Sequence, residues 1–326
     1  MRPPSRQRVV VYIAAALVAA AFAFAPTPYS LILPGSAIDV RDVVNVRGYP
    51  PPAQHYFMTD VTLREAVSTP WLLAAALPGA TIVRTSELVP SGVSISQYDA
   101  IMRDAMTESQ LVAAVVAERA AHLPVKRPDE QVEIVKFDER SRAQPALQTG
   151  DTIVRVDGNS VHTTVEVQTA LAHRTPGAVV SVDFVHRGQR HRATIKTIEL
   201  GGKTRLGVYI VGRVRPPPLP VAVKFKDFDV SGSSAGLMFA LHIYESLERN
   251  REPSLERIAG TGTLAYDGTV GPIEGAPQKL IAAKRAGAQL FFVPRENYAE
   301  IASITGIRIV PVHTFRAALT VLGVSP

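Results

Sequence analysis

The chain has 326 residues, of which 46% are hydrophobic and 20% are charged, proportions that fit a globular protein with a substantial core. It contains no cysteine, which excludes disulfides, thiolate zinc sites and a cysteine nucleophile. The formal net charge is +6, but the lysines and arginines are scattered among acids rather than gathered with aromatic residues, so we expect no nucleic acid partner. A chain of this length holds two modest domains, or one domain inserted in another.

Residues 9–25, VVVYIAAALVAAAFAFA, carry no charge, and their number is near the lower limit of about 17 to 25 for a membrane-spanning helix. Three arginines precede this run, and no lysine or arginine follows it before Arg41, which predicts a cytoplasmic N-terminus and an exported remainder. A cleaved signal peptide is the alternative, because Ala23-Phe24-Ala25 resembles a cleavage site, although Pro26 behind it disfavours cleavage. We therefore predict a basic tip and a single-pass transmembrane anchor in residues 1–26.

Residues 27–123 are expected to form an N-terminal exported region. Residues 55–63 have a strand-like pattern, and an apolar stretch follows at residues 71–77. Residues 96–122 predict a long helix, because apolar side chains recur there at helical spacing. We find no catalytic pattern in this region.

Residues 124–199 predict a compact mixed domain. Residues 132–137 and 151–157 have the patterns of strands, and the second of them ends in an Asp157-Gly158 turn. Residues 163–173 have helical spacing with a threonine cap, and two alternating strands flank Arg187-Gly188 as a hairpin. The proline-rich residues 213–220, RVRPPPLP, predict an extended surface connection to the next domain.

Residues 145–158, PALQTGDTIVRVDG, resemble the A-x-x-G-D-x-I-x-x-V-(D/N)-G signature of bacterial PDZ domains. The resemblance implies a domain that captures an extended peptide as an added strand beside a helix, here near residues 165–172. The glycine-rich loop that binds a terminal carboxylate is not evident before Val132. The alternative is a small α/β domain that only spaces its neighbours.

The segment after residue 220 predicts a strand, a Gly-Ser turn and an amphipathic helix that begins near Ser234. A serine at the start of a helix is often only a cap, and Ser233 and Ser234 fit that interpretation. A nucleophile at this position is chemically sound as well, because the first-turn amides and the helix dipole stabilise a neighbouring oxyanion. A serine nucleophile also needs a base, since its hydroxyl is not ionised at neutral pH.

A candidate base lies in residues 276–286, which predict a helix that Gly287 ends. Lys279 stands among the apolar residues of this helix. Taken alone it would be a lysine whose stem packs on the protein while its ammonium reaches water. If it is buried beside Ser234, its pKa falls toward neutrality and it can accept the hydroxyl proton.

Two motifs resemble the proteolytic domain of Lon proteases. Residues 231–236, SGSSAG, are similar to the D-G-P-S-A-G nucleophile loop of that family, and residues 261–279, TGTLAYDGTVGPIEGAPQK, are similar to its T-G-E … G-x-V-x-P-I-G-G-x-x-x-K pattern. The resemblance extends over residues 224–325 and implies a serine protease with Ser234 as nucleophile and Lys279 as general base. It also implies a supporting hydroxyl at Thr261 and backbone groups near the oxyanion at Gly232, Ser233 and Ala235.

The sequence departs from the Lon pattern at four positions: Ser231 and Ser233 replace an aspartate and a proline, Thr263 replaces a glutamate, and Glu274 replaces a glycine. The first three changes concern the fine geometry of the loop. A carboxylate close to Lys279 would favour the charged form of the lysine and oppose its action as a base. We expect Glu274 to point to solvent.

Other site chemistries fit less well. Residues 201–204, GGKT, lack the earlier glycine of a P-loop, since Thr197 stands there, and H-E-x-x-H does not occur, so we predict no nucleotide, metal or other cofactor. Residues 232–236 also match the G-x-S-x-G nucleophile elbow of Ser-His-Asp hydrolases. That alternative requires His242 or His313 as the base and leaves the pattern around Lys279 unexplained.

The order of parts resembles the secreted PDZ-containing Lon-type proteases of Gram-positive bacteria, in which the segment at residues 56–63 belongs to the Lon-type fold and the PDZ module is an insertion. We predict an α+β protein with a transmembrane helix in residues 1–26, a Lon-like α/β catalytic domain from residues 27–123 and 200–326, and a PDZ-like domain at residues 124–199.

The predicted function is an ATP-independent serine endopeptidase on the outer face of the cell membrane, which cleaves exported peptides or flexible protein segments. Analogy with Lon-type domains suggests a hexamer. The alternative is a non-catalytic, PDZ-based scaffold or sensor at the membrane surface.

Overall fold

The computed structural model describes residues 6–65, 67–88, 95–126, 128–228, 230–248 and 256–324. The chain divides into two compact units. The first comprises Met1–Val125 and Leu219–Pro326, and the second, Lys126–Pro218, is inserted between these two parts. The inserted unit therefore extends beyond residue 199, where the sequence analysis ended it.

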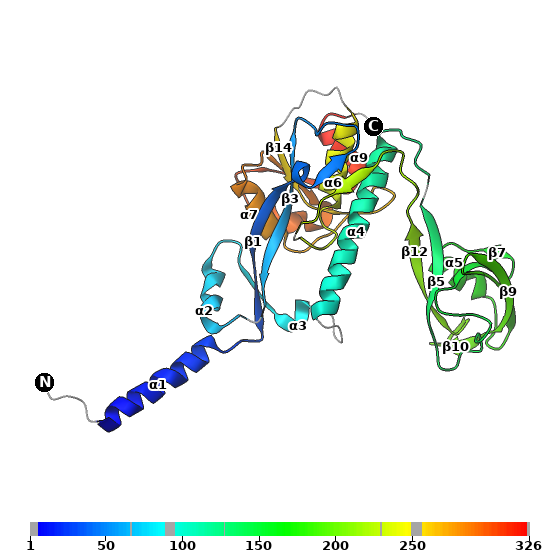
Figure 1. The fold of residues 1–326 in the computed structure, drawn as a ribbon, viewed down its shortest axis with the longest axis horizontal. Coiled ribbons are helices and arrows are strands. Elements are labelled where there is room, and N and C mark those ends of the chain that lie inside the picture. Colours follow the sequence, from blue (N-terminus) through cyan, green and yellow to red (C-terminus); the bar gives the residue numbers. More distant parts are fainter. Residues whose placement is uncertain are drawn as a thin grey trace. The chain divides into compact units, whose positions relative to one another are not determined.

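A six-stranded sheet with the strand order β18-β17-β14-β3-β1-β4 forms the centre of the first unit (Figure 1). Its strands are β1 (Tyr29–Asp39), β3 (His55–Arg64), β4 (Thr81–Arg84), β14 (Arg257–Gly260), β17 (Leu290–Pro294) and β18 (Arg308–Val312). Strands β3, β14, β17 and β18 run parallel, whereas β1 is antiparallel to both of its neighbours. The strands before the inserted unit thus share one sheet with the strands after it.

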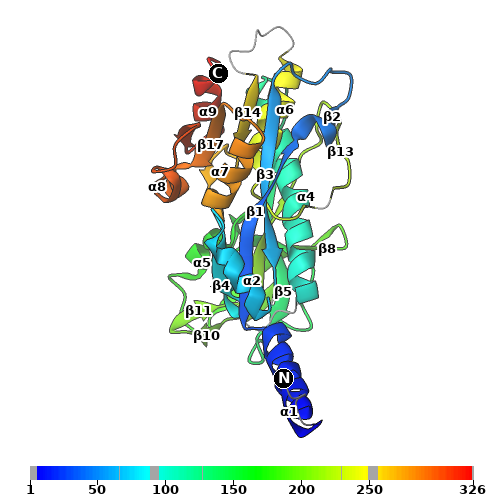
Figure 2. The same ribbon diagram turned by 90° about the vertical axis from the view of Figure 1, so that its left-hand side faces the viewer.

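Helices cover both faces of this sheet, because successive side chains of each strand point to opposite faces. On one face Tyr56, Met58 and Phe292 belong to a core shared with helices α4, α6 and α9. On the other face Phe57 and Phe291 pack with helix α7, which lies in front of the strands in Figure 2. The bounds of these helices are Ile95–Ala120 (α4), Gly236–Leu247 (α6), Ala276–Arg285 (α7) and Phe315–Val321 (α9).

The remaining elements of the first unit are short, apart from α1. They are α1 (Arg6–Phe24), α2 (Thr69–Leu72), α3 (Thr85–Leu88), α8 (Tyr298–Ile301), the paired strands β2 (Val44–Val46) and β13 (Val223–Phe225), the hairpin of β15 (Thr263–Leu264) and β16 (Val270–Gly271), and three 3-10 turns, η1 (Val40–Asp42), η2 (Leu73–Ala76) and η3 (Arg295–Asn297). Among the described residues no helix is long and apolar enough to cross a bilayer, so the transmembrane anchor expected in residues 1–26 is not supported.

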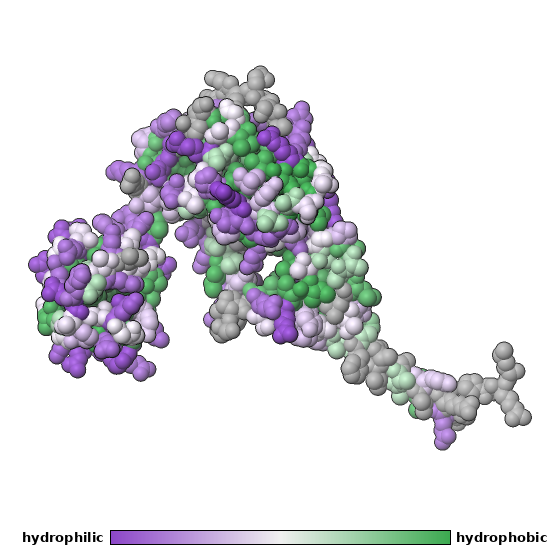
Figure 3. Space-filling model, turned by 180° about the vertical axis from the view of Figure 1, so that it is seen from behind, coloured by the Kyte–Doolittle hydropathy of each residue, from purple (hydrophilic) through white to green (hydrophobic). Residues whose placement is uncertain are grey.

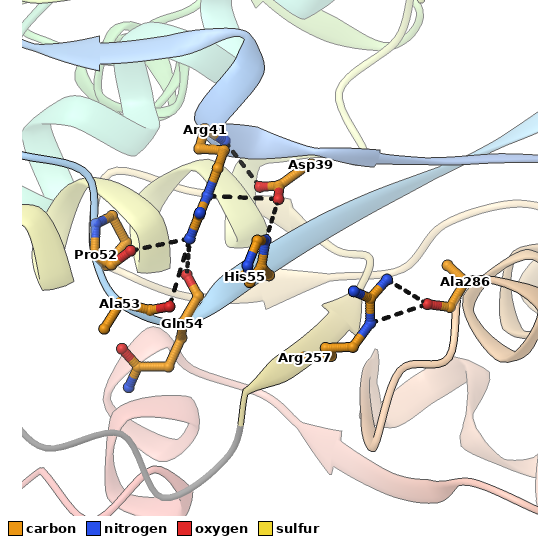
Figure 4. A network of polar contacts seen from close by, with 8 residues as sticks. All are labelled: Asp39, Arg41, Pro52, Ala53, Gln54, His55, Arg257 and Ala286. Carbon is orange, nitrogen blue, oxygen red and sulfur yellow. Dashed lines mark hydrogen bonds and ion pairs between the residues drawn. The ribbon is translucent and has the colours of Figure 1, made fainter.

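Polar contacts hold the amino ends of the central strands (Figure 4). Arg41 donates to the carbonyl oxygens of Pro52 and Gln54 at 3.1 and 3.2 Å and lies 3.5 Å from the carboxylate of Asp39. On the adjacent parallel strand, the guanidinium of Arg257 donates twice to the carbonyl oxygen at the end of α7, at 3.1 and 2.5 Å. The Arg41 contacts tie the end of β1 to the segment before β3, and the Arg257 contacts tie β14 to the end of α7.

The inserted unit has its own sheet with the order β12-β5-β6-β8-β9, and β7 pairs with β6. Its elements are β5 (Asp129–Phe137), β6 (Thr152–Val156), β7 (Asn159–Ser160), α5 (Thr164–Leu171), β8 (Val179–His186), β9 (Gln189–Lys196), β10 (Ile198–Leu200), β11 (Lys203–Arg205) and β12 (Val208–Arg215). Helix α5 begins with a capping box in which Thr163 and Glu166 bond reciprocally to backbone amides, as the threonine cap predicted.

The boundary of the inserted unit was placed too early because β12 pairs with β5 along its whole length. Residues 213–215, expected in the extended connection, are therefore part of the sheet. The prolines begin only at Pro216, where a missing amide no longer interrupts the ladder of hydrogen bonds.

Candidate active site

Ser234 lies in the turn directly before helix α6. The helix begins at Gly236, its N-cap residue is Ala235, and no side chain caps it, so neither Ser233 nor Ser234 has the capping role that its position allowed. A side chain at Gly236 would force its surroundings to shift, because its Cβ would stand 2.8 Å from Oγ of Ser109 on helix α4. The glycine therefore lets the turn that carries the serine pack closely against α4.

Lys279 reaches Ser234 from helix α7, on the opposite face of the sheet. Its Nζ donates to Oγ of Ser234 at 2.8 Å and to Oγ1 of Thr261 at 3.5 Å. Thr261 directly follows β14 and is fully buried, and its hydroxyl donates to the carbonyl oxygen of Ser234 at 3.2 Å. The structure thus brings the predicted serine, lysine and threonine together at the carboxyl end of β14.

Burial lowers the pKa of Lys279 and two neighbouring carboxylates raise it. The side chain is only 5% exposed, and this burial lowers the pKa of Lys279 from its ordinary value of 10.5 to about 8. The charges of Asp60 and Glu274 act in the opposite direction and raise the pKa of the lysine. The remaining shift still leaves a usable fraction of free base near neutral pH.

Of the two carboxylates that act on Lys279, the sequence pointed to Glu274 but not to Asp60. Glu274 is exposed, in agreement with the expectation that it points to solvent, yet its charge acts on Lys279 and also contributes, after burial, to the raised pKa of Tyr98. Asp60 was missed, because it belongs to no motif. It comes close through strand β3, where its carboxylate accepts the amide of Ser36 across a bulge in β1.

The backbone around Ser234 corrects one part of the predicted oxyanion site. The amide of Gly232 donates to the carbonyl oxygen of Met102 at 2.9 Å, so it is not free to bind an oxyanion. In contrast, the amides of Ser233, Ser234 and Ala235 have no acceptor within the described part of the chain. Free amides beside a nucleophile are the groups that stabilise a developing oxyanion.

The histidine-based alternative has no geometric support. His242 is buried on α6, burial lowers its pKa to about 4, and its Nδ1 has no hydrogen-bond partner among the described residues. His313 is exposed, on the connection between β18 and α9. Among the contacts of the described residues, neither imidazole is hydrogen-bonded to Ser234, whose Oγ meets Lys279 instead.

Comparison with known families agrees with this arrangement. Residues 227–319 match the family described as the Lon protease (S16) C-terminal proteolytic domain, and residues 106–197 match the PDZ domain family. The chain carries a Lon-type proteolytic domain and a PDZ domain. The Lon-type match contains Ser234, Thr261 and Lys279, and this homology supports a serine peptidase.

Individual relatives share parts of the chain. Lon protease 2 of Bacillus subtilis is 32% identical over 115 residues, which is 35% of this chain and 20% of that protein. The archaeal Lon protease of Thermoplasma volcanium is 26% identical over 249 residues, 72% of this chain and 35% of that protein. The chain therefore spans well under two thirds of the length of these relatives. The solved PDZ domain of an SdrC-like protein from Listeria monocytogenes is 23% identical, with a TM-score of 0.23, and covers 24% of this chain and 86% of that structure.

Proposed function

We propose that this chain is a serine endopeptidase in which Ser234 is the nucleophile and Lys279 the general base. The observation that carries the proposal is the 2.8 Å contact between Nζ and Oγ, made by a lysine that is almost fully buried. With a pKa of about 8, roughly a tenth of Lys279 is neutral at pH 7, whereas an ordinary lysine has almost no neutral form there. A neutral amine at this distance is a competent base for the serine hydroxyl.

In the proposed reaction, Oγ of Ser234 attacks the scissile carbonyl carbon while its proton passes to Nζ of Lys279. The amides of Ser234 and Ala235 stabilise the oxyanion of the tetrahedral intermediate. When the C–N bond breaks, Nζ returns the proton to the leaving amine, and an ester on Oγ remains. Water then attacks the ester, Lys279 takes the proton of the water, and Ser234 is released with its hydroxyl restored.

Thr261 is proposed as a positioning residue. Its hydroxyl hydrogen is used in the bond to the carbonyl oxygen of Ser234, so its oxygen is left to accept an N–H of Lys279. A neutral lysine held by this bond turns its lone pair toward Oγ. The assembly of these three residues by the chain itself supports hydrolysis without ATP, and flexible segments or small peptides are the substrates expected without an unfolding step.

The PDZ domain is proposed to present the substrate. Strand β12 is at the edge of its sheet, with Leu206-Gly207 directly before it, and a hollow near α5 is lined by Ala172, Lys203 and Arg205. An edge strand next to a helix can pair with an extended peptide, and the two cations suit a carboxylate. The peptide-binding edge would thus lie at the end of this domain, rather than at its start before Val132.

The test compares casein cleavage and self-cleavage by the full chain with those of Ser234→Ala and Lys279→Ala. Lys284→Ala is the matched control, because Lys284 is an exposed lysine of the same helix whose Nζ bonds a carbonyl oxygen away from the serine. We expect both site variants to stay folded and to lose activity by orders of magnitude, and the control to keep it. Activity in folded Ser234→Ala would refute the proposal, and inertness of every protein would favour the PDZ-based scaffold.

A further inference from the structure

Large apolar side chains lie exposed on the first unit, around the segment that joins β3 to β4. Trp71, Leu73 and Leu77 are 43%, 79% and 56% exposed, and Ile82 on β4 is 39% exposed. At the end of α1, Phe24 is 75% exposed. We call these five residues the Trp71 patch, and Figure 3 shows a hydrophobic surface next to the end of α1 on this side of the molecule. Monomeric soluble proteins rarely expose a contiguous surface of this kind without a function.

Backbone hydrogen bonds tie the Trp71 patch to the end of α1. The amide of Thr27 donates to the carbonyl oxygen of Val67 at 3.1 Å, and the amide of Val67 donates to the carbonyl oxygen of Tyr29 at 2.9 Å. Pro26 forms a β-bridge with Ser68. Helix α2 therefore starts directly beside the point where the chain leaves α1. Because α1 itself exposes Tyr12, Ile13 and Leu17 by 55% to 68%, the apolar surface continues along the helix.

The chemistry of the patch suits lipid better than protein. Residues 70–77, PWLLAAAL, contain no hydrogen-bonding side chain other than the indole of Trp71, whereas protein interfaces carry a polar rim and about one hydrogen bond per 100–200 Å². The guanidinium of Arg64 stands over the ring of Trp71 at 4.3 Å from its centre. An indole accompanied by a cation is typical of side chains at the level of lipid headgroups. Arg64 and Glu65 both line a hollow beside Trp71, so their charges offset one another. Apolar burial rather than net charge would therefore drive the contact with lipid.

We propose that the Trp71 patch docks on the surface of a phospholipid bilayer, with Trp71 at the boundary between headgroups and acyl chains. The patch is connected to the proposed catalytic helix, because Thr81 of β4 accepts a hydrogen bond from Gln278 of α7 at 2.8 Å. Docking would therefore hold α7, and Lys279 on it, in a fixed orientation to the lipid. The inference depends on the patch and not on proteolysis.

Trp71 is the chain's single tryptophan, so its fluorescence reports on the patch alone. The full chain is titrated with phosphatidylcholine vesicles whose acyl chains are brominated either near the headgroup or at their deep end. We expect a blue shift of the emission, and stronger quenching by the shallow bromines. Leu73→Glu with Leu77→Glu should abolish both signals. Val179→Glu is the matched control, since Val179 is 61% exposed on the inserted unit, and it should behave as the wild type.

The outcomes separate the lipid from the other candidate occupant, a second copy of the chain. Trp71 emission that stays unchanged while the protein floats with the vesicles would overturn the proposal. So would equal quenching in the double glutamate variant. A blue shift that grows with protein concentration in the absence of lipid would assign the patch to self-association instead.

Discussion

Because Lys279 is buried, we predict that this proposed base lowers the stability of the folded chain. Its pKa falls from 10.5 to about 8 in the folded chain, a difference that corresponds to about 3 kcal/mol. Because the folded pKa is depressed, the unfolded chain binds more protons between these two values, and stability rises with pH across the window from about 8 to 10.5. Below pH 8 the full cost is present.

Replacing Lys279 with methionine removes the ionisable group and keeps a side chain of similar length. We expect Lys279→Met to be more stable than the wild type at pH 7, by up to about 3 kcal/mol, with the difference shrinking toward zero near pH 10.5. The loss of the bonds to Ser234 and Thr261, each worth about 0.5 to 1.5 kcal/mol, reduces this gain at every pH.

The assay is urea unfolding at pH 7 and pH 10, followed by circular dichroism and by the fluorescence of Trp71, which lies in the first unit. Lys284→Met, on the exposed side of the same helix, serves as the control and should change stability by less than about 0.5 kcal/mol. A Lys279→Met protein that is less stable than the wild type at both pH values would refute the reasoning. A gain that is independent of pH would show that packing, not the charge, is responsible.

Two further predictions concern the neighbours of the site. The activity of the wild type should rise with pH, with a midpoint near pH 8. Glu274→Gln removes a charge that raises the pKa of Lys279, so the midpoint should move to lower pH in this variant. An unchanged midpoint would exclude Glu274 as a determinant of the pH dependence. Gly236→Ala should cost about 1 to 3 kcal/mol in urea unfolding and lower the activity, because the new Cβ meets Oγ of Ser109 at 2.8 Å, and Ser109→Gly in the same chain should restore part of both.

The sequence predicted those features of the site that local patterns encode. The helix that carries Lys279 follows from apolar spacing and a terminal glycine, and the strand at residues 55–63 from its strand-like pattern, and both occur in the structure. The meeting of Ser234 with Lys279 was inferred from resemblance to Lon proteases, since no spacing rule brings together two helices on opposite faces of a sheet. A single sequence holds no signal for that contact.

Features that depend on distant pairing were missed for the same reason. Asp60 approaches Lys279 through the register of β3 in the sheet, and β12 joins the inserted unit through its pairing with β5, far earlier in the chain. Likewise, a serine before a helix looks like a cap until its hydroxyl is seen to meet a lysine instead of a backbone amide. In each case the deciding partner lies outside the local window.

The position of the site explains why these distant features converge. Ser234 precedes a helix on one face of the sheet, Lys279 lies on a helix of the other face, and Thr261 follows the strand between them. The two helices can meet only beyond the end of β14, where no strand separates them. Forming the sheet therefore forms the site and buries the lysine in the same step, which is why the low pKa that suits Lys279 as a base must also appear as a loss of stability.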